Sequence, residues 1–98
     1  MSESRAFSSG LQTADATIRT GKGLLVGLIV NTDGGGVNDA TAVLYDNTAA
    51  SGTVLCKLVA DAVGAGTANI TFPHPIQCEN GIHLDITGTG AEAIVYYK

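Results

Sequence analysis

The chain has 98 residues, of which 45% are apolar and 14% are charged, and its formal net charge is −4. A chain of this length forms one domain, and its apolar content excludes a disordered tail because it supplies enough side chains for a core. The five Lys and Arg residues form no cluster. Nucleic acid, which is bound by massed positive charge, is therefore not expected as a partner.

The N-terminal residues, MSESRAFSSG, contain no apolar run of the length that a signal peptide or a membrane span needs. We therefore expect synthesis in the cytoplasm and no membrane partner. Cys56 and Cys78 lack the spacing of a metal or redox site, so in a reducing compartment they are expected as buried thiols. A disulfide between them stays open as an alternative if the protein leaves the cell.

Short β-branched or alternating apolar runs recur between turns rich in Gly, Asn, Asp and Ser, and no segment keeps a helical period. This pattern predicts an all-β chain, a single small β-sandwich or jelly-roll-like domain of about eight antiparallel strands, with a small barrel as the alternative. The expected strands lie at Ala14–Thr20, Gly23–Val30, Thr41–Asp46, Thr53–Val59, Thr67–Phe72, Pro75–Cys78, Ile82–Thr87 and Ala91–Tyr97.

Residues 1–12 are polar and rich in serine, and we expect them to form an extended N-terminal arm before a domain over residues 13–98. Such an arm would lie across a neighbouring subunit or a larger shell. Phe7 and Leu11 are expected as its apolar anchors, with Arg5 and Arg19 as charged pairing groups.

Two of the expected strands are apolar on both faces. In Gly23–Val30 apolar residues occupy odd and even positions alike, and in the last strand Ile94 and Tyr96 point opposite to Ala93 and Val95. A second surface must cover the outer face, which could be a loop, the N-terminal segment or another subunit. We predict an oligomer. The expected subunit-interface residues are Leu25, Ile29, Ile94 and Tyr96.

The other strands alternate, so one set of side chains should face the core. The expected inward residues are Val54, Cys56 and Leu58, then Ala68, Ile70 and Phe72, and finally Ile82, Leu84 and Ile86. Pro73 and Pro75 each remove a backbone donor. Their segment should therefore lie on a sheet edge or at a bend between strands.

Three patterns suggest chemistry, and each lacks a required part. His83 and Asp85 share one strand face, yet a tetrahedral metal site needs four donors and the chain has two His. Asp33, Asn38 and Asp39 surround three glycines without the spacing of a calcium loop. Neither cysteine is expected at a helix N-terminus that would activate a thiol, and Lys57, next to Cys56, falls on the opposite face of the expected strand. We therefore predict no enzyme, and no catalytic, cofactor-binding or metal residues.

The segment Thr41–Thr53, TAVLYDNTAASGT, carries the most specific sequence pattern of the chain. Together with Asn80–Gly90 and Ala93–Lys98 it resembles the short β-sandwich virion proteins of tailed bacteriophages. The resemblance spans roughly residues 13–98, and its most specific piece is LYDNTAASG. Pro73-His-Pro75 and the two cysteines are not part of that pattern.

The resemblance implies a structural subunit, commonly a homotrimer or another oligomer. It would decorate (cement) the capsid surface by binding the major capsid protein, or form part of a neck, tail or fibre. Arg5, Phe7, Leu11 and Arg19 would then contact the capsid. A carbohydrate-binding module is the rival from another class. Exposed aromatic platforms favour sugar binding, and the chain offers no Trp and three Tyr.

Overall fold

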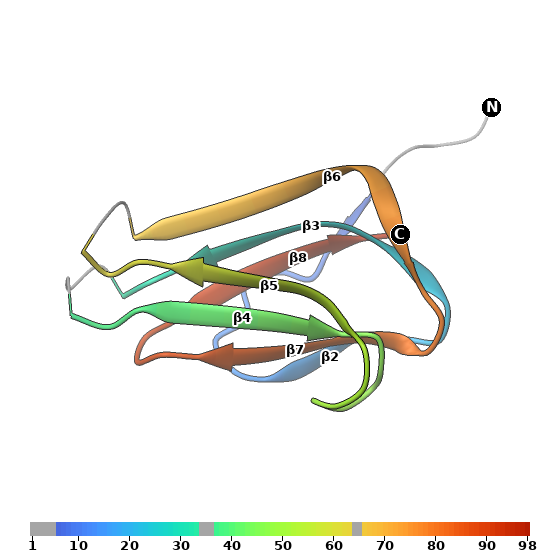
Figure 1. Ribbon diagram of the computed structural model, residues 1–98, viewed down its shortest axis with the longest axis horizontal. Helices are drawn as coiled ribbons and strands as arrows, with labels where there is room; N and C mark the ends of the chain where they lie inside the picture. Colours follow the sequence, from blue (N-terminus) through green and yellow to red (C-terminus); the bar gives the residue numbers. More distant parts are fainter. Residues whose placement is uncertain (1–5, 34–36, 64–65) are drawn as a thin grey trace.

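The computed structural model describes residues 6–33, 37–63 and 66–98 (Figure 1). In these ranges the chain forms eight strands in two four-stranded antiparallel sheets. Sheet A contains, in spatial order, β1 (Phe7–Ser8), β8 (Glu92–Tyr97), β3 (Gly23–Asn31) and β6 (Thr67–Cys78). Sheet B contains, in spatial order, β2 (Ala16–Thr20), β7 (Gly81–Thr87), β4 (Ala40–Tyr45) and β5 (Val54–Ala60).

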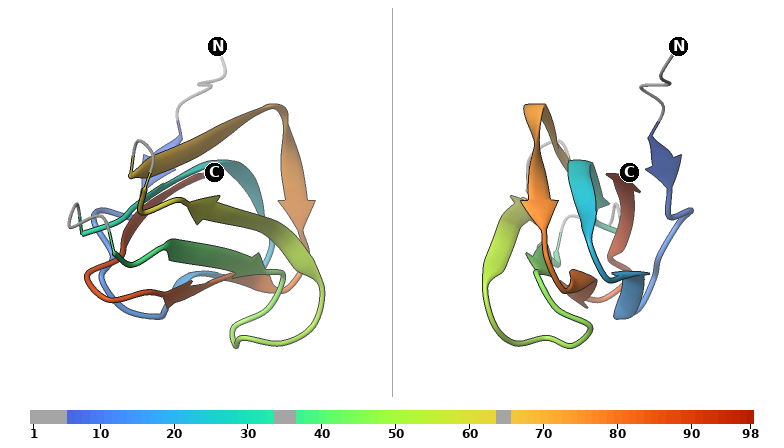
Figure 2. Two further views of the ribbon diagram at one scale, coloured as in Figure 1. Left: turned by 60° about the vertical axis from the view of Figure 1, so that its left-hand side comes forward. Right: turned by 90° about the vertical axis from the view of Figure 1, so that its right-hand side faces the viewer.

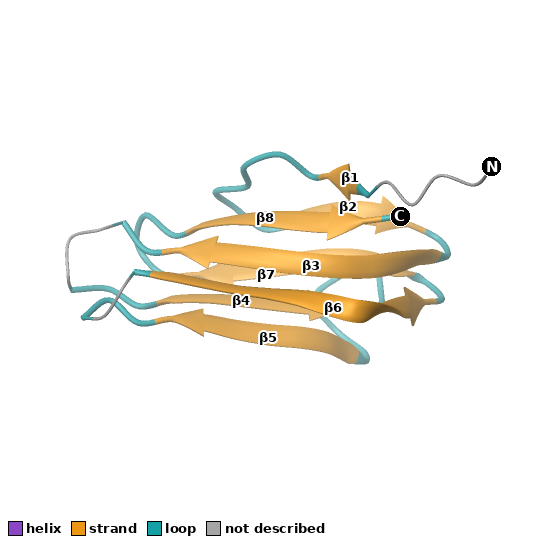
Figure 3. Cartoon of the chain, turned by 90° about the horizontal axis from the view of Figure 1, so that it is seen from above, coloured by secondary structure: helices purple, strands orange, loops and turns teal. Residues whose placement is uncertain are grey.

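The strand order is that of a jelly roll. Strands far apart in sequence pair as β1 with β8, β2 with β7 and β3 with β6, while β4 and β5 form the closing hairpin. The two sheets stack as layers, and successive strands other than β4 and β5 alternate between them (Figures 2 and 3). This arrangement confirms the expected all-β sandwich. None of the described residues forms a helix of the length and apolarity that crossing a membrane requires.

The core lies between the two sheets and is made by alternate side chains of their central strands. Ile82 and Leu84 of β7 are fully buried, as the alternation of this strand predicts, and Leu44 of β4 lies beside them. Leu28 and Val95 close the core from sheet A. Burying one such side chain contributes about 1.5–3 kcal/mol, so this layer accounts for much of the stability of the sandwich.

A β-bulge in β3 changes which side chains face outward. The register with β8 shifts between Leu25 and Gly27, which lie opposite Tyr97 and Tyr96, so one extra residue, Val26, is inserted in β3 there. Leu25 and Leu28 therefore both face the core, and Leu25 is fully buried. The expectation that Leu25 lies on the outer face is wrong. At Gly27 a Cβ would lie 2.8 Å from the carbonyl oxygen of Ile70, which explains the glycine.

The two strands expected around the prolines are one bent strand, β6, at the edge of sheet A. Its pairing with β3 stops at Thr71 and resumes at Ile76, and the prolines occupy the gap. Pro73 and Pro75 therefore need no ladder donors, as the sequence predicts for an edge or a bend. Ile70, expected inward, is 36% exposed because it lies on the open edge strand.

A second register shift changes which side chains face the core at the start of β5. The register shifts between Leu44 and Tyr45, which pair with Cys56 and Val54 respectively. Cys56 and Leu58 pack against the core as expected, but Val54 is 51% exposed. The inward prediction for Val54 is wrong because the register shift lies between Val54 and Cys56, where it breaks the alternation of inward and outward side chains.

The carboxylate of Asp46 joins the turn after β4 to the turn between β6 and β7. It accepts hydrogen bonds from the backbone N–H groups of Glu79 (3.0 Å), Asn80 (2.8 Å) and Gly81 (3.4 Å), which form the turn between β6 and β7. Gly81 has φ +151°, and a Cβ there would lie 2.5 Å from the carbonyl oxygen of Arg19. These N–H groups lower the pKa of Asp46, mainly through Asn80.

We predict that Asp46→Asn lowers the free energy of unfolding by about 1 kcal/mol, because hydrogen bonds to an exposed carboxylate lie at the low end of their range. The folded pKa of Asp46 is depressed, so its contribution is complete above the unfolded pKa and is lost as the pH falls below about 4. Urea unfolding at pH 7 and pH 3 measures both effects, and the difference between wild type and variant should shrink at pH 3.

Asp61→Asn is the matched control, because among the described residues the Asp61 carboxylate accepts the N–H of Val63 alone, within its own turn. It should change the free energy of unfolding less than Asp46→Asn does. Equal effects of the two substitutions at both pH values would contradict the role given to Asp46.

Candidate functional site

The outer surface of sheet A carries an apolar face on its two central strands. Ile29 of β3 lies directly opposite Ile94 of β8, and Tyr96 lies opposite Gly27. Ala93 and Val95 alternate with Ile94 and are fully buried, so the side chains of Ile94 and Tyr96 point away from the core. Ile29, Ile94 and Tyr96, all partly exposed, are called the apolar face below.

Polar residues border the apolar face on the side of β6. Asn69 lies opposite Ile29, and Thr71 lies opposite Gly27. A small apolar centre with a polar rim is the arrangement of a protein contact surface. Three of the four residues predicted for a subunit interface therefore share one surface, while Leu25 belongs to the core.

The four residues predicted for capsid contact do not lie on one element. Arg5 lies outside the described residues. Phe7 and Leu11 are 64% and 55% exposed, and they lie on the segment that runs alongside β8. Arg19 is exposed on β2, and its Nε donates a hydrogen bond of 2.6 Å to the carbonyl oxygen of Lys22.

Residues 7–12 run along the free edge of β8 and extend sheet A by one strand. Phe7 and Ser8 pair with Tyr97 and Tyr96, so sheet A begins within the segment expected as an arm. The ring centroids of Phe7 and Tyr97 lie 5.7 Å apart. Farther along, Gln12 and Ala93 exchange two backbone hydrogen bonds of 2.8 and 2.9 Å.

A small hollow of about 190 Å³ opens between this segment and β2, lined mainly by Ser8, Ser9, Gln12, Thr17 and Tyr97. Its volume lies below the range of about 300–1,000 Å³ that small-molecule sites occupy. The hollow marks the place where the edges of the two sheets diverge.

The outer surface of sheet B is polar near β2 and β7. His83 Nδ1 lies 3.1 Å from the hydroxyl of Thr17 on the neighbouring strand. Asp15 precedes β2, and its carboxylate accepts a hydrogen bond of 2.8 Å from the backbone N–H of Ile86. Burial raises the pKa of Asp85, with repulsion from Asp15 as a further cause and attraction by His83 opposing it. His83 and Asp85 thus have protein partners on this surface.

Candidate metal ligands do not gather in the described residues, where no group of three His, Cys, Asp or Glu side chains could hold an ion. In the glycine-rich loop, the carboxylate of Asp39 accepts a hydrogen bond of 2.8 Å from the backbone N–H of Ala62. This bond joins the loop before β4 to the loop after β5. Residues 34–36, the glycines of that loop, lie outside the described residues.

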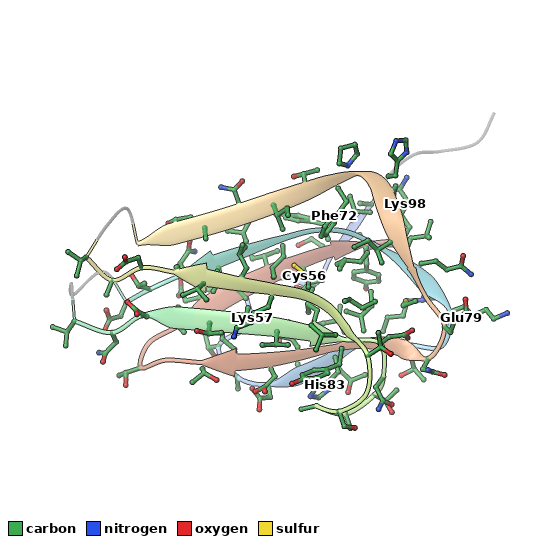
Figure 4. The ribbon with its side chains drawn as sticks, viewed as in Figure 1. Cys56, Lys57, Phe72, Glu79, His83 and Lys98 are labelled. Carbon is green, nitrogen blue, oxygen red and sulfur yellow. The ribbon has the colours of Figure 1, made fainter. Side chains whose placement is uncertain are left out.

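Both cysteines are free thiols in the interior. Cys78 is fully buried at the end of β6, and Cys56 of β5 is partly buried among side chains between the sheets (Figure 4). Burial raises the pKa of each thiol. A raised thiol pKa disfavours the thiolate that nucleophilic attack requires, so these cysteines act as core side chains.

The three tyrosines occupy separate surfaces. Tyr96 belongs to the apolar face, while Tyr45 alternates with buried Leu44 and so lies on the outer surface of sheet B. Tyr97 packs against the core and the ring of Phe7. The three tyrosine rings therefore do not form one aromatic platform of the kind that favours sugar binding.

Comparison with protein-family models, with curated proteins and with solved structures found no significant match to this chain.

The carboxylates that hold the loops together by hydrogen bonds were not predicted from the sequence. Asp15, Asp39 and Asp46 each accept a backbone N–H from a segment more than 20 residues away. Asx residues beside strand ends commonly bond to nearby backbone, and this tendency singles them out as turn residues. Their distant partners depend on which loops the jelly roll brings together.

We predict that Asp85→Asn raises the free energy of unfolding at pH 7 by about 0.5 kcal/mol, the scale of exposed charge pairs. The amide removes the charge that burial and Asp15 disfavour. The folded pKa of Asp85 is raised, so wild type should lose this penalty as the pH falls through the folded pKa, and the two proteins should converge near pH 4. Thermal unfolding at pH 4 and pH 7 measures the difference, and a destabilised variant at pH 7 would contradict the prediction.

Proposed function

We propose that this chain is a virion structural protein of a tailed bacteriophage, and that it decorates the capsid surface as a cement protein. Two findings support the proposal: the jelly-roll architecture and the LYDNTAASG pattern of residues 44–52, which resembles such proteins. The observation that carries it is the apolar face on the central strands of sheet A. An isolated two-layer sandwich would place polar residues there.

Cementing requires binding surfaces and no bond-making chemistry. A subunit that binds the assembled lattice more tightly than its separate components stabilises the particle by the difference in binding free energy. When several subunits are joined in one oligomer, each weak lattice contact is strengthened by a high effective concentration. The apolar face would join the subunits, and Phe7, Leu11 and Arg19 would contact the lattice, since all three are exposed.

These three side chains do not form one compact patch. Phe7 lies opposite Tyr97 at the end of β8. Arg19 lies at the same end, since the Cβ position at Gly23 is 2.6 Å from Arg19 Nε and 2.9 Å from the carbonyl oxygen of Lys98. Leu11 lies farther along β8, beside the Gln12 bridge. The end of the sandwich that holds Phe7 and Arg19 is therefore the part that we propose faces the lattice.

The proposal predicts that purified protein binds phage heads that lack it and occupies symmetry-related lattice sites. Cosedimentation measures the binding, and an electron-microscopy map of the decorated particle gives the position and copy number. A few copies confined to a neck or tail would favour the alternative structural subunit. Failure to bind any part of the particle would overturn the proposal.

We predict that Ile94→Lys weakens subunit association by about 10- to 100-fold, which is the effect of no longer burying one large aliphatic side chain. Light scattering over a concentration series measures the dissociation. Val43→Lys is the matched control, because Val43 is also partly exposed but lies on the outer surface of sheet B. Equal weakening by both substitutions, or unfolding of Ile94→Lys, would contradict an interface at the apolar face.

A further inference from the structure

The segment Phe7–Gln12, called the N-terminal strand segment below, is held almost entirely by backbone hydrogen bonds to β8. Ser9 N–H donates to the carbonyl oxygen of Val95 at 2.8 Å, and Gln12 exchanges two bonds with Ala93. Backbone bonds of this kind do not depend on which chain supplies the segment. The segment therefore fits equally well on β8 of its own chain or of another copy.

Side-chain packing holds this segment weakly. Phe7 and Leu11, its two large apolar residues, are 64% and 55% exposed. The backbone ladder is also interrupted at Gly10, where φ is +74°. Because the chain turns away there, the N–H of Val95 donates to the hydroxyl of Ser9 at 2.9 Å in place of a backbone carbonyl. Release of the segment would thus expose little core.

Directly after the segment, a hydrogen bond holds the chain to β7, and this bond is called the fixed point below. The Asp15 carboxylate accepts the N–H of Ile86, and β2 begins at the next residue. Thr13 and Ala14, between Gln12 and Asp15, belong to no strand. A short connection between a weakly held strand and a fixed point is the place where a chain can redirect that strand to a neighbour.

We propose that the N-terminal strand segment is exchanged between subunits, so that each copy places residues 7–12 on β8 of its neighbour. This inference rests on the oligomer of the proposed function and deepens it by naming the segment that joins the copies. The exchanged segment makes the same bonds that it makes within one chain, so exchange changes few contacts. What is lost is the high effective concentration of a segment tethered to its own β8.

The apolar face offsets this loss. Ile94 and Tyr96 lie on β8 itself, the strand that accepts the segment, and Ile29 lies on the adjacent strand. A neighbour that donates its segment to β8 is therefore held beside the apolar face, which gains a cover. Every subunit donates one segment and accepts one, so the copies join in a ring where the rotation between neighbours closes.

Disulfide trapping tests the exchange. Phe7 and Tyr97 are cross-strand partners whose rings already touch, so cysteines at both positions can bond. In a background of Cys56→Ser and Cys78→Ala, one chain carries Phe7→Cys and the other carries Tyr97→Cys. The two are unfolded together, refolded, oxidised and run on a non-reducing gel. Exchange predicts a linked pair that contains one chain of each kind, identified by mass spectrometry.

The control mixes the Phe7→Cys chain with a Val59→Cys chain, since Val59 lies on β5 of the other sheet and, at 48% exposed, is more accessible than Tyr97. It should give no comparable yield of linked chains. A third sample carries Phe7→Cys and Tyr97→Cys in one chain. If this protein forms an oligomer by light scattering but gives only internally bonded monomer on the gel, exchange is overturned while the oligomer stands. If it remains a monomer with an internal disulfide, exchange is overturned too, and particle binding separately decides the cement proposal.

Discussion

The pairing of β3 with β8 is the interaction on which the rest of the sandwich depends. These strands are the centre of sheet A, and their inward residues, including Leu28 and Val95, form one wall of the core. The same two strands present the apolar face on the other side. One pair of strands therefore supplies one wall of the core and the apolar face. The requirements of folding and of assembly act on neighbouring residues of the same strands.

Carboxylates hold the ends of the sandwich, and they respond to pH in opposite directions. Asp46 is stabilised as an anion by three backbone N–H groups, whereas the charged form of Asp85 is disfavoured by burial and by Asp15. Acid therefore weakens the Asp46 contact while it relieves the repulsion on β7. The two effects fall in successive pH ranges, because a raised carboxyl pKa lies above the unfolded value and a lowered one lies below it. As the pH falls, the Asp85 penalty is lost first and the Asp46 contribution afterwards.

Hydrophobic alternation and turn residues were enough to predict the two-layer architecture and every strand except β1 and the continuous β6, because they depend on local sequence. The alternation of Ile82 and Leu84 identified core residues correctly for the same reason. Register shifts could not be predicted, since a bulge is decided by both partner strands at once. That is why Leu25 and Val54 were assigned to the wrong side. The two residues at β1 were missed because so short a strand has no period of its own.

The candidate surface, too, was predictable only where it depends on local sequence. Ile94 and Tyr96 were identified because their strand is apolar at every position from Ala93 to Tyr97, which needs no knowledge of the fold. The place of residues 7–12 beside them was not, since it depends on the jelly roll bringing the first strand to the last. That closure puts a weakly held segment of the chain next to the apolar face. A monomer gains nothing from having this segment beside the apolar face. In an oligomer, the segment of one copy holds its neighbour beside the apolar face. Each contact then strengthens the other by raising its effective concentration.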